Sequence, residues 1–167
     1  EKETMHIRKA VLQDVEELLA IYNDEVLHGV ATLDLTPKTL DEWRLWFCQH
    51  NTSHNPLLVA EHQGQVAGYA CLSPYRSKEA YRSTVELSVY VGRQNRRQGV
   101  ATSLMEAILQ KARQDDGIHT VVSVITHGNE VSRHLHEKYG FIFCGQIREV
   151  GMKQGRYLDI DNYQLMV

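Results

Sequence analysis

The stretch that decides the fold of this chain reads Tyr90-Val91-Gly92-Arg93-Gln94-Asn95-Arg96-Arg97-Gln98-Gly99-Val100-Ala101. It leaves a segment with a period of two and enters one with helical spacing, which predicts a strand-to-helix turn. Gly99 lets the backbone approach a ligand closely, and Ala101 keeps the helix start uncluttered. The first helical amides lack acceptors within the helix, and the helix dipole adds positive charge there. With its arginines, such a turn suits a pyrophosphate.

The same turn lacks two common nucleotide-binding motifs. It contains no G-x-x-x-x-G-K-[ST] and no G-x-G-x-x-G followed by a suitably placed acid. This excludes a P-loop and a dinucleotide fingerprint. A solvated basic loop that caps an amphipathic helix is the alternative interpretation of these residues.

Patterns on both sides of the turn predict strands mixed with helices. Strand-like spacing occurs at residues 6–10, 57–62, 66–72, 85–91, 119–126, 141–150 and 157–167. Helical spacing occurs at residues 15–26, 40–47, 99–113 and 129–139. Shorter signals are a hairpin at Gln63-Gly64, a capping box from Thr39 to Glu42, and a last turn holding Gly151 and Gly155. This order predicts an α/β sandwich around a mixed sheet, as a single domain over residues 1–167.

Composition excludes several classes of protein. The chain has 167 residues, and its 18 basic against 21 acidic side chains argue against a general nucleic-acid binder. Its longest apolar run is Leu18–Tyr22, whereas a membrane span needs about 20 residues. The N-terminal residues lack the apolar core of a signal peptide. Three widely spaced cysteines indicate reduced thiols, packed as small core residues, and a cytoplasmic location.

Four segments together resemble a known family. Arg96-x-x-Gly99-x-Ala101 matches the [Q/R]-x-x-G-x-[G/A] motif of GNAT-fold acyl-CoA N-acyltransferases. Residues 85–91 resemble the strand before that family's cofactor loop, and residues 128–141 its later helix with the following Gly-Phe. Residues 151–159 and Gln164 resemble the tail of its phosphinothricin / methionine sulfoximine N-acetyltransferase-like branch. The resemblance covers nearly the whole chain, and it implies a mixed central sheet that is splayed midway and flanked by helices on both faces.

The resemblance also implies an activity and a cofactor. The expected enzyme is an acetyl-CoA-dependent N-acetyltransferase that acts by direct transfer in a ternary complex. Its partner would be a small amine, namely an amino acid or analogue such as phosphinothricin, methionine sulfoximine or methionine sulfone, and the chain would form a homodimer. The cofactor-binding positions that it implies are Leu87, Ser88, Val89, Val91, Asn95, Arg96, Arg97, Gln98, Gly99, Val100, Ala101, Asn129 and Ser132.

The resemblance places the reacting thioester as well. Pantetheine would dock beside Leu87–Val91, because a strand with free backbone groups can pair with an extended amide chain. The thioester would lie at a splay between this strand and His119–Thr126, where a main-chain amide near Val89 would donate to its oxygen.

Glu86 is the charged residue in an otherwise apolar or small strand. Attack on a thioester needs a neutral amine, but alkylammonium groups have pKa values near ~10. A carboxylate within reach can take the proton, which typically accelerates a reaction about 10²–10⁴-fold. The resemblance makes Glu86 the general base. The alternative is a strand carboxylate that faces solvent or forms a salt bridge.

The helix at residues 129–139 carries two stripes of side chains. The polar stripe consists of Asn129, Ser132, Arg133 and His136. The apolar stripe consists of Val131, Leu135 and Tyr139, and we expect it to face the sheet. In many GNAT enzymes a tyrosine seven residues after the asparagine protonates the departing thiolate, and this chain has His136 there. Three roles of His136 remain open: a general acid, a second base, and a packed or surface histidine without a catalytic role.

A basic loop at residues 74–84 lies immediately before Glu86. The resemblance implies that the carboxylate of a small amino acid meets Arg76 or Arg82, and that Ser83, Thr84 and Val85 line the site. A solvated loop is the alternative. The branch often has a tryptophan before the first arginine, whereas this chain has Pro74-Tyr75, so the accepted side chain stays open. Residues 32–36 are a further candidate for shaping the pocket.

Other chemistries find no support in the sequence. There is no H-E-x-x-H and no paired cysteine spacing, so we expect no metal. No serine or cysteine lies in a recognisable nucleophile motif, which disfavours a covalent mechanism. Two alternative functions remain: acetylation of another amine, such as a protein N-terminus or a polyamine, and a non-catalytic acyl-CoA sensor. The basic loop favours an anionic substrate over a polyamine, and the presence of both Glu86 and His136 argues against a sensor.

Overall fold

The computed structural model describes residues 5–167, and residues 1–4 of the N-terminal segment considered above lie outside them. The strands are β1 (His6–Lys9), β2 (Leu57–His62), β3 (Gln65–Pro74), β4 (Thr84–Val91), β5 (Thr120–Thr126), β6 (Ile142–Lys153) and β7 (Arg156–Met166). The α-helices are α1 (Val15–His28), α2 (Leu40–His50), α3 (Val100–Gln114) and α4 (Glu130–Lys138). Short 3-10 helices are η1 (Leu12–Asp14), η2 (Glu79–Tyr81) and η3 (Arg93–Asn95). This order of strands and α-helices confirms the predicted one.

Two local signals act as predicted. Thr39 caps α2 by accepting a hydrogen bond from the Glu42 amide, while the Glu42 carboxylate accepts one from the Thr39 amide. Gln63 and Gly64 have φ values of 53° and 74°, which is the left-handed conformation that a tight hairpin between β2 and β3 requires.

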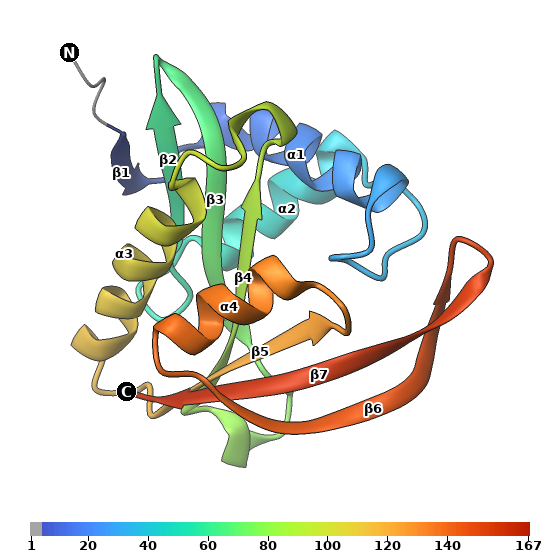
Figure 1. Cartoon of the computed structure of the whole chain (residues 1–167). Coiled ribbons are helices and arrows are strands. Elements are labelled where there is room, and N and C mark those ends of the chain that lie inside the picture. Colours follow the sequence, from blue (N-terminus) through green and yellow to red (C-terminus); the bar gives the residue numbers. More distant parts are fainter. Residues whose placement is uncertain (1–4) are drawn as a thin grey trace.

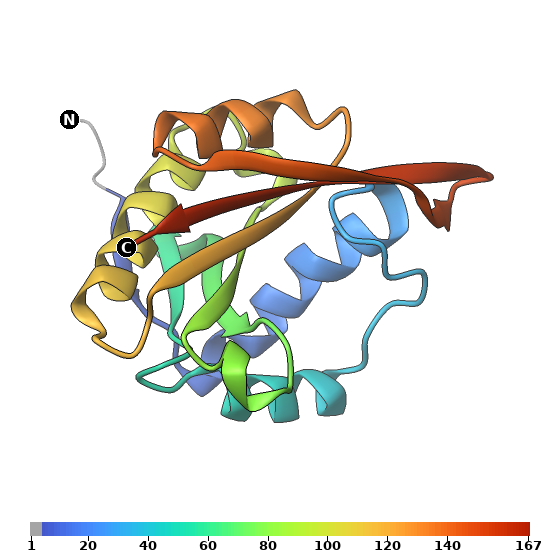
Figure 2. The same cartoon turned by 90° about the horizontal axis from the view of Figure 1, so that it is seen from below.

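The seven strands form one mixed sheet in the order β1-β2-β3-β4-β5-β7-β6, with helices on both faces (Figures 1 and 2). The helices α1 and α2 bury Leu18, Trp43 and Phe47 against one face. On the opposite face α3 buries Leu104 and Ile108 in the main core, and residues of α4 pack beside it. The amphipathic stripes read from the sequence therefore cover the two faces of the sheet.

The sheet opens between its fourth and fifth strands. All other neighbouring strands are antiparallel, but β4 and β5 run parallel and pair only from Thr84–Thr120 to Glu86–Val122. Beyond Glu86, β4 and β5 no longer pair, so the sheet of the described residues divides into two half-sheets at this point. The sheet is splayed midway, as expected.

The last two strands extend beyond the body of the molecule as a long arm (Figure 2). Here the prediction for Gly151 was wrong: it lies within β6 and pairs with Leu158, while the turn consists of Gln154 and Gly155. The difference arises because a register shift between Ile147 and Gly151 absorbs the irregularity and cross-strand pairing then resumes.

Two further predictions about burial were wrong. Val131 is 82% exposed, because the face of α4 that is buried is centred near His136, and five positions along a helix turn a side chain about 140° away. Only Leu135 and Tyr139 of that stripe pack against the core. Of the three free cysteines, Cys71 is buried but Cys48 and Cys144 are exposed, so only one is a core residue. No helix of the described chain is long and apolar enough to span a membrane.

Candidate active site

Glu86 stands at the point where the sheet opens. It pairs with Ser73 of β3 on one side and with Val122 of β5 on the other, and it is the last residue of β4 that pairs with β5. Its side chain is half-buried, and burial raises the pKa of the carboxyl group above its ordinary value. A carboxylate with a raised pKa is a better proton acceptor, which fits the predicted general base.

Beyond Glu86, one edge of β4 faces the opening between the half-sheets. In an antiparallel pair, alternate residues exchange hydrogen bonds, and the Gly92 amide donates to the Ala67 carbonyl at 2.8 Å. Counting back in this alternation, the backbone groups of Leu87, Val89 and Val91 point away from β3 and toward the gap. An extended amide chain could therefore pair with this edge as an added strand.

The turn before α3 presents its backbone and its cations outward. Asn95 ends η3, and residues 96–99 are exposed. Gly99 has φ 80°, a left-handed conformation that directs the chain into Val100 and Ala101, the first residues of the helix. The first amides of α3 therefore lie at the end of an exposed, arginine-bearing turn, the arrangement predicted to hold a pyrophosphate.

Asn129 and Ser132 shape the start of α4. The Asn129 side chain accepts a hydrogen bond from the Ser132 amide at 3.2 Å, so the predicted cofactor contact also acts as the helix cap. Both residues are partly exposed.

His136 is buried, with 5% of its surface exposed, and both ring nitrogens have partners. Nδ1 lies 2.7 Å from the Ser132 carbonyl oxygen, and Nε2 lies 2.9 Å from Ser123 Oγ. A carbonyl only accepts, so Nδ1 carries the proton and the Ser123 hydroxyl donates to Nε2. Burial lowers the pKa of His136, opposed by its bond to the carbonyl, so the ring is held in the neutral form. Its role as acid, base or packed residue stays a prediction.

The basic loop sits directly beside Glu86. Pro74 pairs with Val85, so residues 75–83 leave and re-enter the sheet next to the carboxylate. The Arg76 guanidinium lies over the rings of Tyr75 and Tyr81, at 5.0 and 5.6 Å from their centroids. Arg82 and Ser83 are exposed, while Thr84 and Val85 begin β4. The structure therefore brings the loop to the same end of the sheet as Glu86. Of its two arginines, Arg76 is held in place by the rings of Tyr75 and Tyr81.

A cavity of about 290 Å³ extends from this point between the sheet and α2. Ser73 and Ser88, which flank Glu86 on the sheet, contribute hydroxyl groups to it. Its aromatic lining consists of Tyr22, Trp43, Trp46, Tyr69 and Tyr90. Asp34 and Lys38, from the segment between α1 and α2, complete it. Sequence reasoning missed this cavity, because its rings come from four elements that only the fold brings together.

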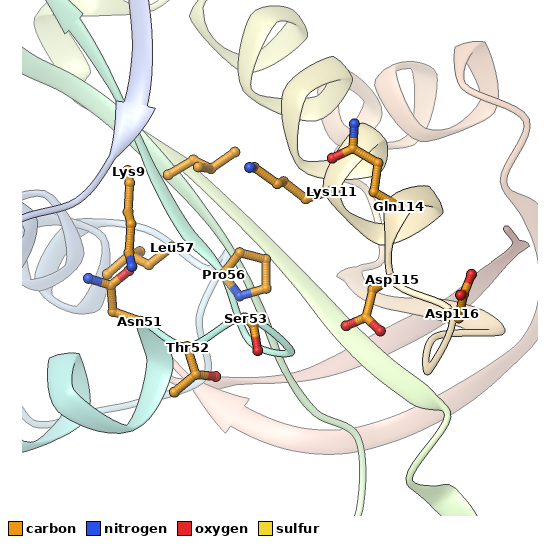
Figure 3. A pocket seen from close by; sticks show the side chains of 11 residues that line it. Lys9, Asn51, Thr52, Ser53, Pro56, Leu57, Lys111, Gln114, Asp115 and Asp116 are labelled. Carbon is orange, nitrogen blue, oxygen red and sulfur yellow. The ribbon is translucent and has the colours of Figure 1, made fainter.

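A larger cavity, of about 620 Å³, lies elsewhere (Figure 3). It is lined by Lys9, Asn51, Thr52, Ser53, Pro56, Leu57, Leu58, Lys111, Gln114, Asp115 and Asp116. None of the predicted site residues is among them. The cavity lies at the C-terminal end of α3, opposite to the helix end that carries the arginine-bearing turn.

Comparison with known proteins supports the geometry. Residues 13–141 match the model of the acetyltransferase (GNAT) family, and those residues include the splayed strand and the turn before α3. The chain belongs to the GNAT acetyltransferase family. GNAT acetyltransferases use acetyl-CoA as the acetyl donor.

Two of three similar proteins carry names of the phosphinothricin / methionine sulfoximine branch, and the third carries another name. A protein from Pseudomonas aeruginosa named L-methionine sulfoximine/L-methionine sulfone acetyltransferase is 40% identical over 95% of this chain and 92% of its own length. The solved structure of a phosphinothricin acetyltransferase from Sinorhizobium meliloti, in complex with acetyl-CoA, is 32% identical with a TM-score of 0.92, covering 98% of this chain and 89% of that one. A structure from Brucella melitensis named ribosomal-protein-alanine N-acetyltransferase is 38% identical with a TM-score of 0.93, covering 97% and 99%.

The described residues of this GNAT enzyme contain no group of three or more His, Cys, Asp or Glu side chains that could hold a metal ion. Two further polar contacts escaped the sequence analysis. One is Ser123, the partner of His136, a serine among the valines and the isoleucine of β5. The other is Glu25, whose carboxylate contacts Arg96 in the turn before α3.

Proposed function

We propose that this enzyme transfers the acetyl group of acetyl-CoA to the amino group of a small amino acid or analogue, such as methionine sulfone, methionine sulfoximine or phosphinothricin. The observation that carries the proposal is the position of Glu86, a half-buried carboxylate of raised pKa at the fork between β4 and β5. The identity of 40% to a methionine sulfoximine/sulfone acetyltransferase supports the substrate class.

Acetyl-CoA would supply an activated acetyl thioester to this site. The free edge of β4, from Leu87 to Val91, would pair with its pantetheine arm, and the Val89 amide would donate to the thioester oxygen. Residues 96–101 would hold the pyrophosphate through backbone amides and arginine side chains. Asn129 and Ser132 would contact the arm from α4.

Glu86 would accept a proton from the substrate ammonium, directly or through water, so that the neutral amine can attack the thioester carbon. As the new C–N bond forms and the C–S bond breaks, the sulfur leaves with the electron pair and takes a proton. Arg76 or Arg82 would bind the substrate carboxylate. The aromatic cavity beside Ser73 and Ser88 would take the substrate side chain, because its terminal methyl group can pack against the rings while the serine hydroxyls can donate to its sulfur- or phosphorus-bound oxygen. Alignment of both reactants accounts for several kcal/mol of the barrier, and it requires no covalent enzyme intermediate.

Thiol release from acetyl-CoA tests the proposal. The panel consists of L-methionine sulfone, L-methionine sulfoximine, phosphinothricin, a peptide with N-terminal alanine, and spermidine. We expect the highest kcat/KM with one of the three amino acids. Fastest turnover of the peptide would establish the activity for which the Brucella relative is named, and tight CoA binding with no thiol release would establish a sensor.

We also propose that the chain pairs with a second copy through the β6–β7 arm. Strand β6 is an edge of the sheet, and exposed apolar side chains line the arm at Ile142, Phe143, Ile147, Val150, Met152 and Tyr157. An exposed apolar strand edge of this size usually marks an interface. Sedimentation equilibrium should give a dimer, and Ile147→Glu should shift it toward a monomer; a wild-type monomer would overturn this assembly. Free thiols at all three cysteines fit a reducing compartment, and we propose the cytoplasm.

A further inference from the structure

The carboxylate of Glu25 connects two loops, one proposed to contact the cofactor and the other close to the proposed acceptor site. Glu25 lies in the last turn of α1, and only 14% of its side chain is exposed. Its Oε2 accepts a hydrogen bond from Arg96 Nη2 at 3.3 Å, in the turn before α3. Its Oε1 accepts one from the Ala31 amide at 2.9 Å, in the loop of residues 29–39 that joins α1 to α2. One side chain therefore contacts the cofactor turn with one oxygen and the 29–39 loop with the other.

The 29–39 loop lies on the acceptor side of the sheet. Its residues Asp34 and Lys38 line the aromatic cavity that begins beside Glu86. Other contacts hold the loop from two sides. Tyr22 and Asn23 of α1 form hydrogen bonds with Thr32, Asp34 and Lys38. From the C-terminal half-sheet, Lys153 Nζ donates to the Thr32 carbonyl at 2.7 Å, and Thr126 Oγ1 donates to the Val30 carbonyl at 2.6 Å. None of these residues lies in the cofactor turn, so Glu25 supplies the contact that connects the loop to that turn.

The space around the Glu25 carboxylate is tight. A Cβ atom built on Gly29 would lie 1.9 Å from Glu25 Oε1, so only glycine leaves room for the carboxylate at this position. The Gly29 amide in turn donates to the Glu25 carbonyl at 2.9 Å. The glycine therefore permits the position from which this side chain reaches both loops.

Arg96 can serve Glu25 and a phosphate at the same time. A guanidinium has five N–H donors, and within the described residues Arg96 uses Nη2 alone, on Glu25. Its side chain is half exposed, which leaves the remaining donors open to solvent at the helix end. A bound pyrophosphate would thus hold an arginine whose orientation Glu25 already sets, and an ordered Arg96 would in turn order Glu25 and the loop it binds.

We propose that Glu25 is a positioning residue that couples binding of the cofactor phosphates to ordering of the 29–39 loop, so that CoA and the acceptor amino acid bind with positive cooperativity. The inference rests on the proposed function, in which Arg96 meets the pyrophosphate and the loop borders the acceptor. Coupling between two sites is reciprocal, so each ligand strengthens the other by the same factor.

The variant Glu25→Gln separates the two contacts. The glutamine oxygen can still accept from the Ala31 amide, but its NH₂ group cannot accept from Arg96. The chain also offers a matched control. Asp24 is the neighbouring residue of α1 and binds Arg93 at 3.2 Å, and its carboxylate makes no hydrogen bond to the 29–39 loop among the described residues. Asp24→Asn therefore removes a similar ion pair next to the same turn while leaving the bridge intact.

Hydrogen exchange with CoA as the only ligand tests the coupling without an acceptor. In the wild type and in Asp24→Asn, we expect saturating CoA to slow amide exchange in residues 29–34 severalfold. In Glu25→Gln, CoA should still bind, but its effect on these amides should be lost while the thermal unfolding midpoint stays close to that of the wild type. Equal protection in Glu25→Gln, or equal loss in Asp24→Asn, would overturn the inference. So would faster exchange with CoA, which would mean that the phosphate pulls Arg96 away from Glu25.

Calorimetric titration of L-methionine sulfone, with and without saturating CoA, tests the cooperativity. We expect CoA to tighten acceptor binding about fivefold or more in the wild type, and a factor near one in Glu25→Gln. If the wild type neither binds nor acetylates any amino acid of the panel but CoA still protects the loop, the proposed substrate is wrong and the coupling stands. If acetylation proceeds and Glu25→Gln keeps the full cooperativity, the function stands and the coupling is wrong. Failure of the wild type to bind CoA would overturn both.

Discussion

Glu86 and Val122 form the last residue pair between β4 and β5, and beyond this pair the sheet divides. The carboxylate therefore sits at the apex of a fork whose β4 edge carries free backbone groups. Because the fork also leads toward the exposed N-terminus of α3, one strand connects the proposed base, the proposed oxyanion donor and the phosphate-binding turn.

Replacing the proposed base tests the chemistry at this fork. We expect Glu86→Gln to lower kcat/KM about 10²–10⁴-fold for the best acceptor, because the isosteric amide cannot take a proton. Burial raises the pKa of Glu86, so kcat/KM of the wild type should fall with pH through a value above 4.5, the ordinary value of a glutamate. Glu16→Gln, an exposed carboxylate in the first turn of α1, is the control and should leave the rate unchanged. Comparable turnover by Glu86→Gln would remove this residue from its role.

The left-handed conformation of Gly99 gives a test of the phosphate-binding turn. Its φ of 80° strains any side chain, so Gly99→Ala should cost about 1 kcal/mol of unfolding free energy and raise KM for acetyl-CoA. Gly64 has a similar φ of 74°, but it lies in the β2–β3 hairpin. Gly64→Ala should lose similar stability and keep the wild-type KM. A raised KM in both variants would show that general loosening, not the turn, affects the cofactor.

The buried His136–Ser123 pair predicts a pH-dependent stability. Burial lowers the pKa of His136 below its ordinary value of 6.5, so the folded state binds fewer protons than the unfolded state. The contribution of the neutral ring to the free energy of unfolding is therefore complete above about pH 6.5. It is lost as the pH falls toward the lowered pKa, by about 1.4 kcal/mol per unit of pKa difference.

Denaturant unfolding at several pH values measures this effect. In a plot of unfolding free energy against pH, His136→Gln should flatten the slope between that lowered pKa and pH 6.5. The control is His28→Gln, which replaces an exposed histidine of α1 and should keep the wild-type slope. Ser123→Ala leaves Nε2 without its partner and should cost about 1–3 kcal/mol. An unchanged slope in His136→Gln would contradict the assignment of a neutral, packed ring.

Carboxylate recognition by the loop before β4 can be tested from both partners. Arg76→Gln or Arg82→Gln should raise KM for the amino acid, by about tenfold or more if the bond is bidentate. The decarboxylated analogue of the same substrate should react slowly with the wild type. Its kcat/KM should fall little further in whichever arginine variant raises KM for the amino acid. An analogue that reacts as fast as its parent would exclude carboxylate recognition.

Several features could be predicted from local sequence alone, because each depends on residues close together in the chain. Thr39 and Glu42 cap the same helix end, and Gln63-Gly64 adopts the positive φ values of a tight hairpin. The period of two from Val85 to Val91 and the helical spacing from Leu104 to Ala112 report which side of each element is buried. These regularities were sufficient for the order of the elements, whereas the fold and the family followed from the resemblance of four segments, among them the motif at residues 96–101.

The remaining features depend on which elements meet, and no local pattern carries that information. The partner of the helical residue His136 is Ser123, thirteen positions earlier on strand β5, so the polar stripe of α4 did not reveal a buried histidine. Val131 is exposed because the tertiary structure buries the side of α4 that carries His136, and Val131 lies on another side of the helix. Gly151 lies inside a strand because β6 and β7 continue to pair past a register shift.

Sequence by itself determined the order of the elements and the position of the turn before α3, since helical and strand periods and turn conformations are set by near neighbours. Only the tertiary structure decided that Glu25 links Arg96 to Ala31 and that aromatic residues of separate elements surround one cavity. Contacts across such distances in the chain arise from packing, where burial of apolar surface and the pairing of buried polar groups select one arrangement for the whole molecule.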